Sequence, residues 1–173
     1  MEERTTMNIP VIALRGLTVF PDLTLSFDVE REISIYALDS AMEGDRTIFL
    51  VTQREIATTA PTEEDLYTVG TVCRILQILK TSETSVRVIV EGQQRARIHR
   101  LWQNKPFLQA NVELLEEDFP GRMTPRMEAL IRQTYVTFGE YKELVPNLTD
   151  DFVSAVLDCR DPGRLADFIA QNI

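Results

Sequence analysis

The sequence is poor in the residues that most catalytic and metal sites require. It holds 1 histidine and 2 cysteines among 173 residues. Two cysteines are too few for a disulfide framework, and the separation of Cys73 and Cys159 fits no spacing of metal ligands. There is no glycine-rich phosphate loop and no dense serine or cysteine motif. The composition therefore disfavours most classes of enzyme, and we expect reduced cytoplasmic thiols.

Long apolar runs are also missing. No stretch of about 18 apolar residues occurs, so the sequence predicts no membrane-spanning helix. The N-terminal Met1-Glu2-Glu3-Arg4 opens with acidic residues and has no apolar segment behind it, which argues against a signal peptide. A hydrophobic content of 44% over this length is enough for about one domain, or for one domain with a helical extension. We expect a cytoplasmic location.

Acidic residues dominate, and the formal net charge is −9. Residues 70–107 reverse this balance, with 7 basic and 2 acidic side chains. Together with Trp102, this basic segment is the feature that favours RNA binding. The overall excess of acid repels nucleic acid at long range, and the same arginines are better explained as solvent-facing strand residues paired with the abundant acidic flanks. Nucleic acid is therefore a disfavoured partner, kept as an alternative.

The first 118 residues show mainly the patterns of β-strands. Polar and apolar residues alternate over 23–29, and runs of β-forming residues occupy 8–14, 47–52, 69–79, 86–90, 96–102 and 107–115. A helical spacing over 30–43, followed by Gly44, predicts one inserted helix. The polar, acidic segment 53–68 predicts a mobile loop with a short turn at 63–66. We expect a curved sheet or partly closed barrel of about six strands.

From residue 119 onwards the apolar spacing is helical. Thr124 and Pro125 supply an N-cap and a proline at the first helical position, and an apolar stripe then runs for about 20 residues. Two shorter helices are expected after it. The sequence therefore predicts an α+β protein with a β domain at 1–118 and a helical subdomain at 119–173. Because the chain stops at Ile173 in an apolar helix, we expect a fragment of a longer protein.

Candidates for conventional chemistry are few. His99 lies in a predicted strand among arginines, with no acid close in sequence to orient it, and is interpreted as a surface histidine. Cys73 is expected to be a small buried thiol and Cys159 ends a short helix, so a cysteine hydrolase is a weakly supported alternative. The acidic runs at 63–65 and 116–118 are interpreted as solvated loops. We predict no catalytic, metal-binding or cofactor-binding residue in this chain.

Apolar residues near loops are the remaining functional candidates. Such residues can mark a docking patch for extended or unfolded polypeptide. The residues predicted to bind substrate are Val19, Phe20, Pro21 and Leu23 around one turn, and Leu79 near the tip of the 69–90 hairpin. In the alternative interpretation, Phe20 is tucked under the sheet as part of the core, and Leu23 belongs to the inward face of its strand.

Several stretches carry a family resemblance. They are Ile12-Ala-Leu-Arg-Gly-Leu-Thr-Val-Phe-Pro21, Ile48-Phe-Leu-Val-Thr-Gln53, Asp65-Leu-Tyr-Thr-Val-Gly-Thr-Val72, Ile75-Leu-Gln-Ile78, Glu91-Gly-Gln-Gln-Arg-Ala-Arg-Ile98 and Leu165-Ala-Asp-Phe-Ile-Ala170. In this order they resemble the N-terminal, substrate-binding domain of Lon, the ATP-dependent serine protease, over residues 9–173. Ala13 and Asp22 depart from the pattern, because the family usually has proline and glycine there.

The resemblance implies a PUA-like β fold with one inserted helix and a helical subdomain after it. It also implies capture of unfolded or damaged proteins for protein quality control, and self-association within a homohexamer. A complete Lon continues into an AAA+ ATPase domain, where ATP and Mg are expected, and into a Ser–Lys protease domain. The motifs of neither occur here. We expect a non-catalytic substrate-recognition and assembly domain, with a stand-alone PUA-like RNA-binding module or LON-domain adaptor as the alternative.

Overall fold

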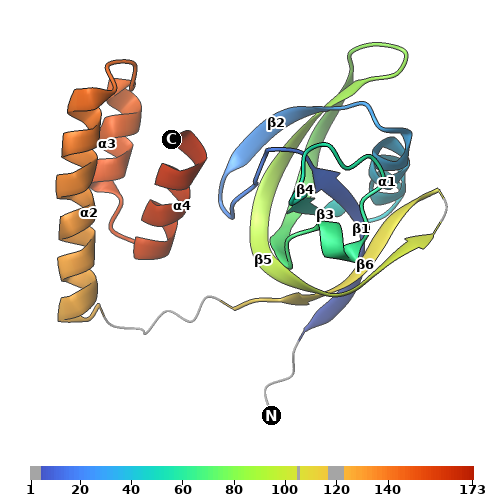
Figure 1. Cartoon of the computed structure of the whole chain (residues 1–173), viewed down its shortest axis with the longest axis horizontal. Helices are drawn as coiled ribbons and strands as arrows, with labels where there is room; N and C mark the ends of the chain where they lie inside the picture. Colours follow the sequence, from blue (N-terminus) through green and yellow to red (C-terminus); the bar gives the residue numbers. More distant parts are fainter. Residues whose placement is uncertain (1–4, 105, 117–122) are drawn as a thin grey trace. The chain divides into compact units, whose positions relative to one another are not determined.

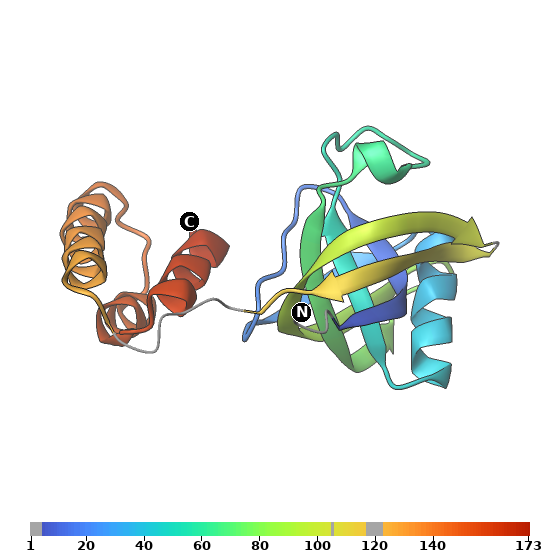
Figure 2. The ribbon, with the colours of Figure 1, turned by 90° about the horizontal axis from the view of Figure 1, so that it is seen from below.

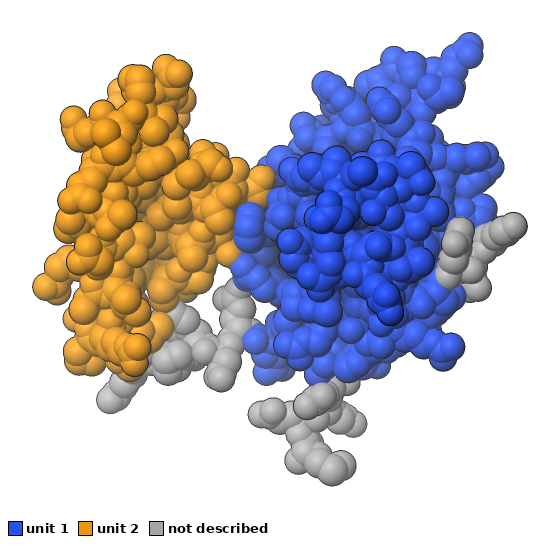
Figure 3. All heavy atoms as spheres, viewed as in Figure 1, with its two compact units in different colours: residues 1–116 blue, residues 117–173 orange. Residues whose placement is uncertain are grey.

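The computed structural model describes residues 5–104, 106–116 and 123–173 of the chain. The chain forms two compact units, residues 1–116 and 117–173, which are coloured separately in Figure 3. In the described residues, the first unit holds the strands and one α-helix, and the second unit holds three helices. The domain boundary predicted between residues 118 and 119 lies outside the described residues.

The first unit is a curved sheet with one helix packed on it. Its elements are β1 (Thr6–Leu14), β2 (Thr24–Val29), α1 (Glu32–Glu43), β3 (Thr47–Thr52), the 3-10 turn η1 (Glu63–Asp65), β4 (Val69–Lys80), β5 (Val86–Asn104) and β6 (Phe107–Leu114). The strand order is β2-β5-β4-β3-β1-β6, and β5 also pairs with β6, so the sheet is partly ring-closed (Figures 1 and 2). The predicted α+β fold with about six strands and one inserted helix is confirmed.

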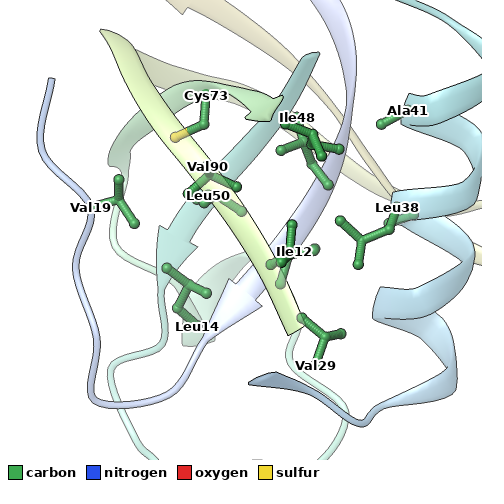
Figure 4. Packing of buried hydrophobic residues seen from close by; sticks show 13 residues of the cluster. Ile12, Leu14, Val19, Val29, Leu38, Ala41, Ile48, Leu50, Cys73 and Val90 are labelled. Atoms are coloured by element: carbon green, nitrogen blue, oxygen red, sulfur yellow. The ribbon is translucent and has the colours of Figure 1, made fainter. Parts of the chain in front are cut away.

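β1 and β3 lie at the centre of this unit, and both faces of each strand are buried. They pair in parallel, with Val11 opposite Phe49. Strands buried on both faces have continuous apolar sequences, as 11–14 and 48–51 do here. One face packs against a first core cluster that includes α1, β2 and the beginning of β5, part of which is seen in Figure 4. The other face packs against a second cluster that includes β6 and the later part of β5.

β5 is a single strand of 19 residues, whereas the sequence predicted two strands at 86–90 and 96–102. Val88 and Val90 belong to the first core cluster, and Ala96 belongs to the second. The register against β4 shifts between these positions, which is the bulge that the sequence predicts near Gly92. One strand therefore contributes side chains to both core clusters.

Gly92 allows the loop before β2 to pack directly on the backbone of β5. A Cβ atom at position 92 would lie 2.1 Å from the carbonyl oxygen of Phe20. The N–H of Asp22 donates to the carbonyl of Gly92, and the N–H of Gly92 donates to the carbonyl of Leu23, both at 2.9 Å. Asp22 itself has a φ of 59°, in the left-handed region that glycine and aspartate tolerate better than most residues. Position 92 therefore requires glycine, and the loop is fixed to β5 by the two hydrogen bonds that Gly92 makes with Asp22 and Leu23.

The polar segment 53–68 is attached to the sheet at both ends. Gln53 and Leu66 form an isolated β-bridge and are 2% and 1% exposed. The Nε atom of Arg54 donates to the carbonyl of Leu66 at 3.1 Å. The predicted short turn is η1, where the N–H and hydroxyl of Thr62 donate to Asp65 and hold the pKa of its carboxyl below the ordinary value. Buried Leu66 is the apolar side chain that fixes this segment.

The second unit consists of α2 (Pro125–Leu144), α3 (Asp150–Asp158) and α4 (Pro162–Asn172). Thr124, Thr149 and Asp161 each accept a hydrogen bond from a backbone N–H of the first turn that follows. The core is formed by buried apolar side chains from all three helices, namely Phe138, Val153, Val156 and Leu165. The expected stripe of α2 is only partly inward, because Leu130 is 59% exposed and Leu144 is 80% exposed.

Replacing Gly92 by alanine is expected to lower the free energy of unfolding of the first unit by about 1–3 kcal/mol. The new Cβ would meet backbone atoms of Phe20, which have no flexible end that can move away. Urea unfolding followed by the fluorescence of Trp102, the single tryptophan, measures this unit. Gly139→Ala is the control, since nothing lies within 4 Å of its added Cβ inside α2, and it should not lower the unfolding midpoint that Trp102 reports. An unchanged midpoint for Gly92→Ala would contradict the packing described above.

Candidate functional site

The structure separates the five residues predicted to bind substrate. Val19 is 4% exposed and belongs to the first core cluster, and Pro21 is also buried. Phe20 and Leu23 are partly exposed, and Leu79 is 43% exposed. Val19 and Phe20 line a pocket at the start of β4, whereas Leu79 lies near the opposite end of that strand. The five side chains therefore do not share one surface, and Phe20 is the partly exposed member beside a hollow.

A groove runs beside Phe20 between two segments that are far apart in sequence, 16–20 and 52–71. We call it the loop groove. Its larger hollow has a volume of about 580 Å³ and is lined, among others, by Gly16, Thr18, Arg54, Ile56, Tyr67 and Val69. A smaller hollow of about 170 Å³ shares Thr18 and Val69 with it and adds Phe20 and Arg95. The shared residues make the two hollows one continuous surface.

Threonine hydroxyls fix one wall of the loop groove. The Thr52 hydroxyl donates to the carbonyl of Leu17 at 2.7 Å, and the Thr71 hydroxyl donates to the carbonyl of Val19 at 2.6 Å. The hydroxyls of Thr18 and Thr52 also lie 3.0 Å apart. These bonds join segment 17–19 to β3 and β4, so the groove exists before any ligand arrives.

Exposed apolar side chains also line the loop groove. Ile56, Tyr67 and Val69 are 63%, 49% and 38% exposed. The guanidinium carbon of Arg54 lies 4.9 Å from the centre of the Tyr67 ring, and that of Arg95 lies 6.0 Å from the centre of the Phe20 ring. Ile56 and Tyr67 were not among the predicted residues, because they occur in a polar, acidic stretch between predicted strands.

The residues considered for conventional chemistry lie apart from the loop groove lining. His99 contacts Glu113 across β5 and β6, with 2.8 Å between Nε2 and Oε2, so the orienting acid comes from a neighbouring strand. Cys73 is fully buried, and burial raises the pKa of its thiol to about 12. In the part of the chain that the structure describes, no three His, Cys, Asp or Glu side chains gather as a metal site. None of the helices in that part is both long and apolar enough to span a membrane.

The architecture is that of Lon N-terminal domains. The N-terminal domain of Lon protease from the Mycobacterium avium complex superimposes with a TM-score of 0.56 at 17% identity, over 96% of this chain and 100% of that one. A Lon N-terminal domain protein from Xanthomonas campestris gives a TM-score of 0.58 at 15% identity, over 96% and 99% of the two chains. At such identities the likeness concerns the fold.

The sequence defines the family. Residues 8–173 match the model described as the ATP-dependent protease La (LON) substrate-binding domain, so the chain belongs to this family. Lon protease of Escherichia coli K12 is 39% identical over 172 residues, which are 99% of this chain and 22% of that protein. Lon protease 1 of Bacillus subtilis is 36% identical over 173 residues, 100% of this chain and 22% of that protein. The chain spans about a fifth of the length of these relatives and corresponds to their substrate-binding domain rather than to the whole protease.

The two cysteines are expected to react very differently with a thiol reagent such as dithionitrobenzoate. Cys73 is inaccessible and its raised pKa keeps the thiol protonated at neutral pH, whereas Cys159 is partly exposed. The native protein should show one rapid equivalent of reaction, and Cys159→Ser should abolish it. In urea both thiols should react. Rapid labelling of Cys73 in the folded Cys159→Ser variant would show that the first core cluster is open to solvent.

Proposed function

We propose that this chain is the substrate-recognition domain of an ATP-dependent Lon-type protease and that it captures unfolded or damaged polypeptides along the loop groove. The observation that carries this proposal is the row of exposed apolar side chains, Ile56, Tyr67 and Val69, in a groove with hydrogen-bonded walls. Membership of the LON substrate-binding domain family supports it.

Unfolded polypeptide offers the apolar side chains that a folded protein hides. Fully burying one such side chain contributes roughly 1.5–3 kcal/mol before the cost of ordering the bound segment. The groove is preformed, so this cost falls mainly on the ligand. A single domain should therefore bind weakly and accept many sequences, because burial of apolar area is not directional.

Assembly would strengthen this capture. In a homohexamer, several copies of the groove would act on the same polypeptide, and the effective concentration of the second site would raise the overall affinity without new contacts. We assign ATP and Mg binding to the AAA+ domain and peptide-bond cleavage to the Ser–Lys protease domain of a full-length Lon. This chain would hold the substrate for those domains in the cytoplasm, as part of protein quality control.

RNA binding by a free PUA-like module is the second candidate, and it rests on the basic segment 70–107. One of its arginines, Arg87, is already engaged by Asp28 through two hydrogen bonds of 2.8 Å. These bonds lower the pKa of the Asp28 carboxyl and raise the pKa of the Arg87 guanidinium. Because Asp28 already neutralises Arg87, this arginine is less available to the phosphates of RNA, and we favour polypeptide capture. A steep decrease of RNA affinity with salt would instead support the RNA-binding candidate.

Ile56→Asp and Phe20→Asp are each expected to weaken binding of a permanently unfolded protein, such as a reduced and carboxymethylated one, by about tenfold. Each replaces an apolar contact by a charge that must be desolvated on binding. Fluorescence anisotropy with the labelled unfolded protein measures the affinity, and circular dichroism checks the fold.

Leu79→Asp is the matched control, because Leu79 is 43% exposed but lies at the other end of β4 from Val69. It should leave the affinity unchanged. Wild-type affinity in folded Ile56→Asp and Phe20→Asp variants would remove the loop groove from consideration. An equal loss in Leu79→Asp would show that the effect comes from added negative charge alone.

A further inference from the structure

A second pocket of the first unit shares no lining residue with the loop groove. It has a volume of about 250 Å³ and lies where the ends of β1 and β2 meet the start of α1. Its lining includes Leu14, Arg15, Phe27, Glu30, Arg31 and Ser34. β6 pairs with β1 only as far as Val11, and β2 pairs with β5, so no ladder joins the end of β1 to β2 in the described residues. The pocket occupies this interruption of the sheet.

Arg31 brings a partly buried positive charge to the pocket. One Nη atom donates to Oε1 of Gln53 at 2.8 Å, and the other donates to the carbonyl of Ala13. Both acceptors are neutral, and no carboxylate lies within ion-pair distance of Arg31 among the described residues. Burial, together with the nearby charge of Arg15, lowers the pKa of the Arg31 guanidinium. The charge is therefore oriented by the protein but not neutralised by it.

Arg15 adds a second guanidinium to the same pocket. Its Nη2 atom donates to the carbonyl of Thr58 at 3.1 Å, which is again a neutral acceptor. Of the two acids in the lining, Asp28 is engaged by Arg87 and Glu30 is exposed. The two arginines thus leave an excess of positive charge at the pocket.

Ser34 supplies a further donor. Ser34 lines the pocket and is 4% exposed, and a hydroxyl at this place can donate to a ligand. It lies in the first turn of α1, and the N-cap residue of this helix makes no capping hydrogen bond through its side chain. The positive end of the helix dipole therefore faces the same region as the two guanidinium groups.

From this arrangement we infer that the pocket binds a carboxylate of a peptide, with the guanidinium groups of Arg31 and Arg15 as charged donors and the Ser34 hydroxyl as a third donor. A planar guanidinium matches the two oxygens of a carboxylate. Leu14, Leu17 and Phe27 in the lining provide apolar contacts for the side chain beside that carboxylate. The carboxylate can belong to the end of a polypeptide or to an aspartate or glutamate side chain.

This inference deepens the proposed function, because an unfolded polypeptide held by the domain carries both kinds of carboxylate. It adds a specificity that an apolar groove lacks. A chain that presents its end, or an acidic residue beside an apolar one, would be bound in preference to a chain without them.

The test compares N-acetyl-leucine with N-acetyl-leucine amide, two probes that differ only in the carboxylate and are too short to follow the loop groove. Each is titrated into the isotopically labelled chain, and the arginine Nε–H signals are followed by NMR. The acid should bind at least about tenfold more tightly than the amide and should shift the signals of Arg15 and Arg31. Ser34→Ala and Arg15→Gln should each reduce this preference several-fold.

Arg31→Lys should also reduce the preference, because an ammonium keeps the charge but loses the planar pair of donors. Arg31 donates hydrogen bonds to Gln53 and to the carbonyl of Ala13, so Arg31→Lys can also destabilise the fold. Ser34→Ala and Arg15→Gln carry the test in that event. Arg74→Gln is the matched control, since it removes an exposed arginine of β4 that does not line the pocket, and it should leave the preference unchanged.

Equal affinity for acid and amide would overturn the inference, and so would a preference that survives in both Ser34→Ala and Arg15→Gln. Two short peptides then identify the source. One has a free C-terminus and no acidic side chain, and the other is amidated and contains one aspartate. Tighter binding of either supports the pocket and assigns the carboxylate. A failure of the proposed function at the loop groove gives a different result. In that case Ile56→Asp would bind the unfolded protein with wild-type affinity, while the chain would still bind N-acetyl-leucine more tightly than its amide.

Discussion

The first unit depends on the close approach of the Phe20 carbonyl to Gly92. Only an absent side chain at this position lets the loop before β2 rest on the backbone of β5. The hydrogen bonds on either side of the contact fix the loop, and with it the ring of Phe20 at the edge of the loop groove. β5 continues past this contact, so one strand contributes to both core clusters. A backbone contact between residues far apart in the sequence thus fixes one edge of the candidate site.

Local patterns predicted most of the elements but not the extent of β5. The alternation over 23–29 and the apolar runs at 8–14 and 47–52 specify strands because their side-chain period is visible in a few residues. Glycine normally weakens a strand, so the sequence around Gly92 favoured a break. β5 is continuous across Gly92 because it pairs there with β4, where Cys73 lies opposite Gly92, and β4 is a separate segment of the chain. Such a cause has no local signature.

The candidate site was predicted less completely than the fold, because its walls come from segments that meet only in the folded unit. Phe20 was among the predicted residues and lies at the groove, but burial of Val19 follows from its packing against the first cluster. Ile56 lies within a stretch whose polarity suggests solvent on every side. The pocket at Arg31 depends on where the ladders of β1 and β2 end, and pairing of strands is not encoded in either strand alone.

The partnership of β1 with β6 has a consequence for biosynthesis. Thr6 lies opposite Glu113, and the side chains of Asn8 and Asn111, 103 residues apart, share a hydrogen bond of 2.9 Å. β1 is synthesised well before β6, so this edge of β1 stays uncovered until β6 has been made. Contacts of this separation slow folding, and a nascent chain with an uncovered apolar strand is prone to aggregation.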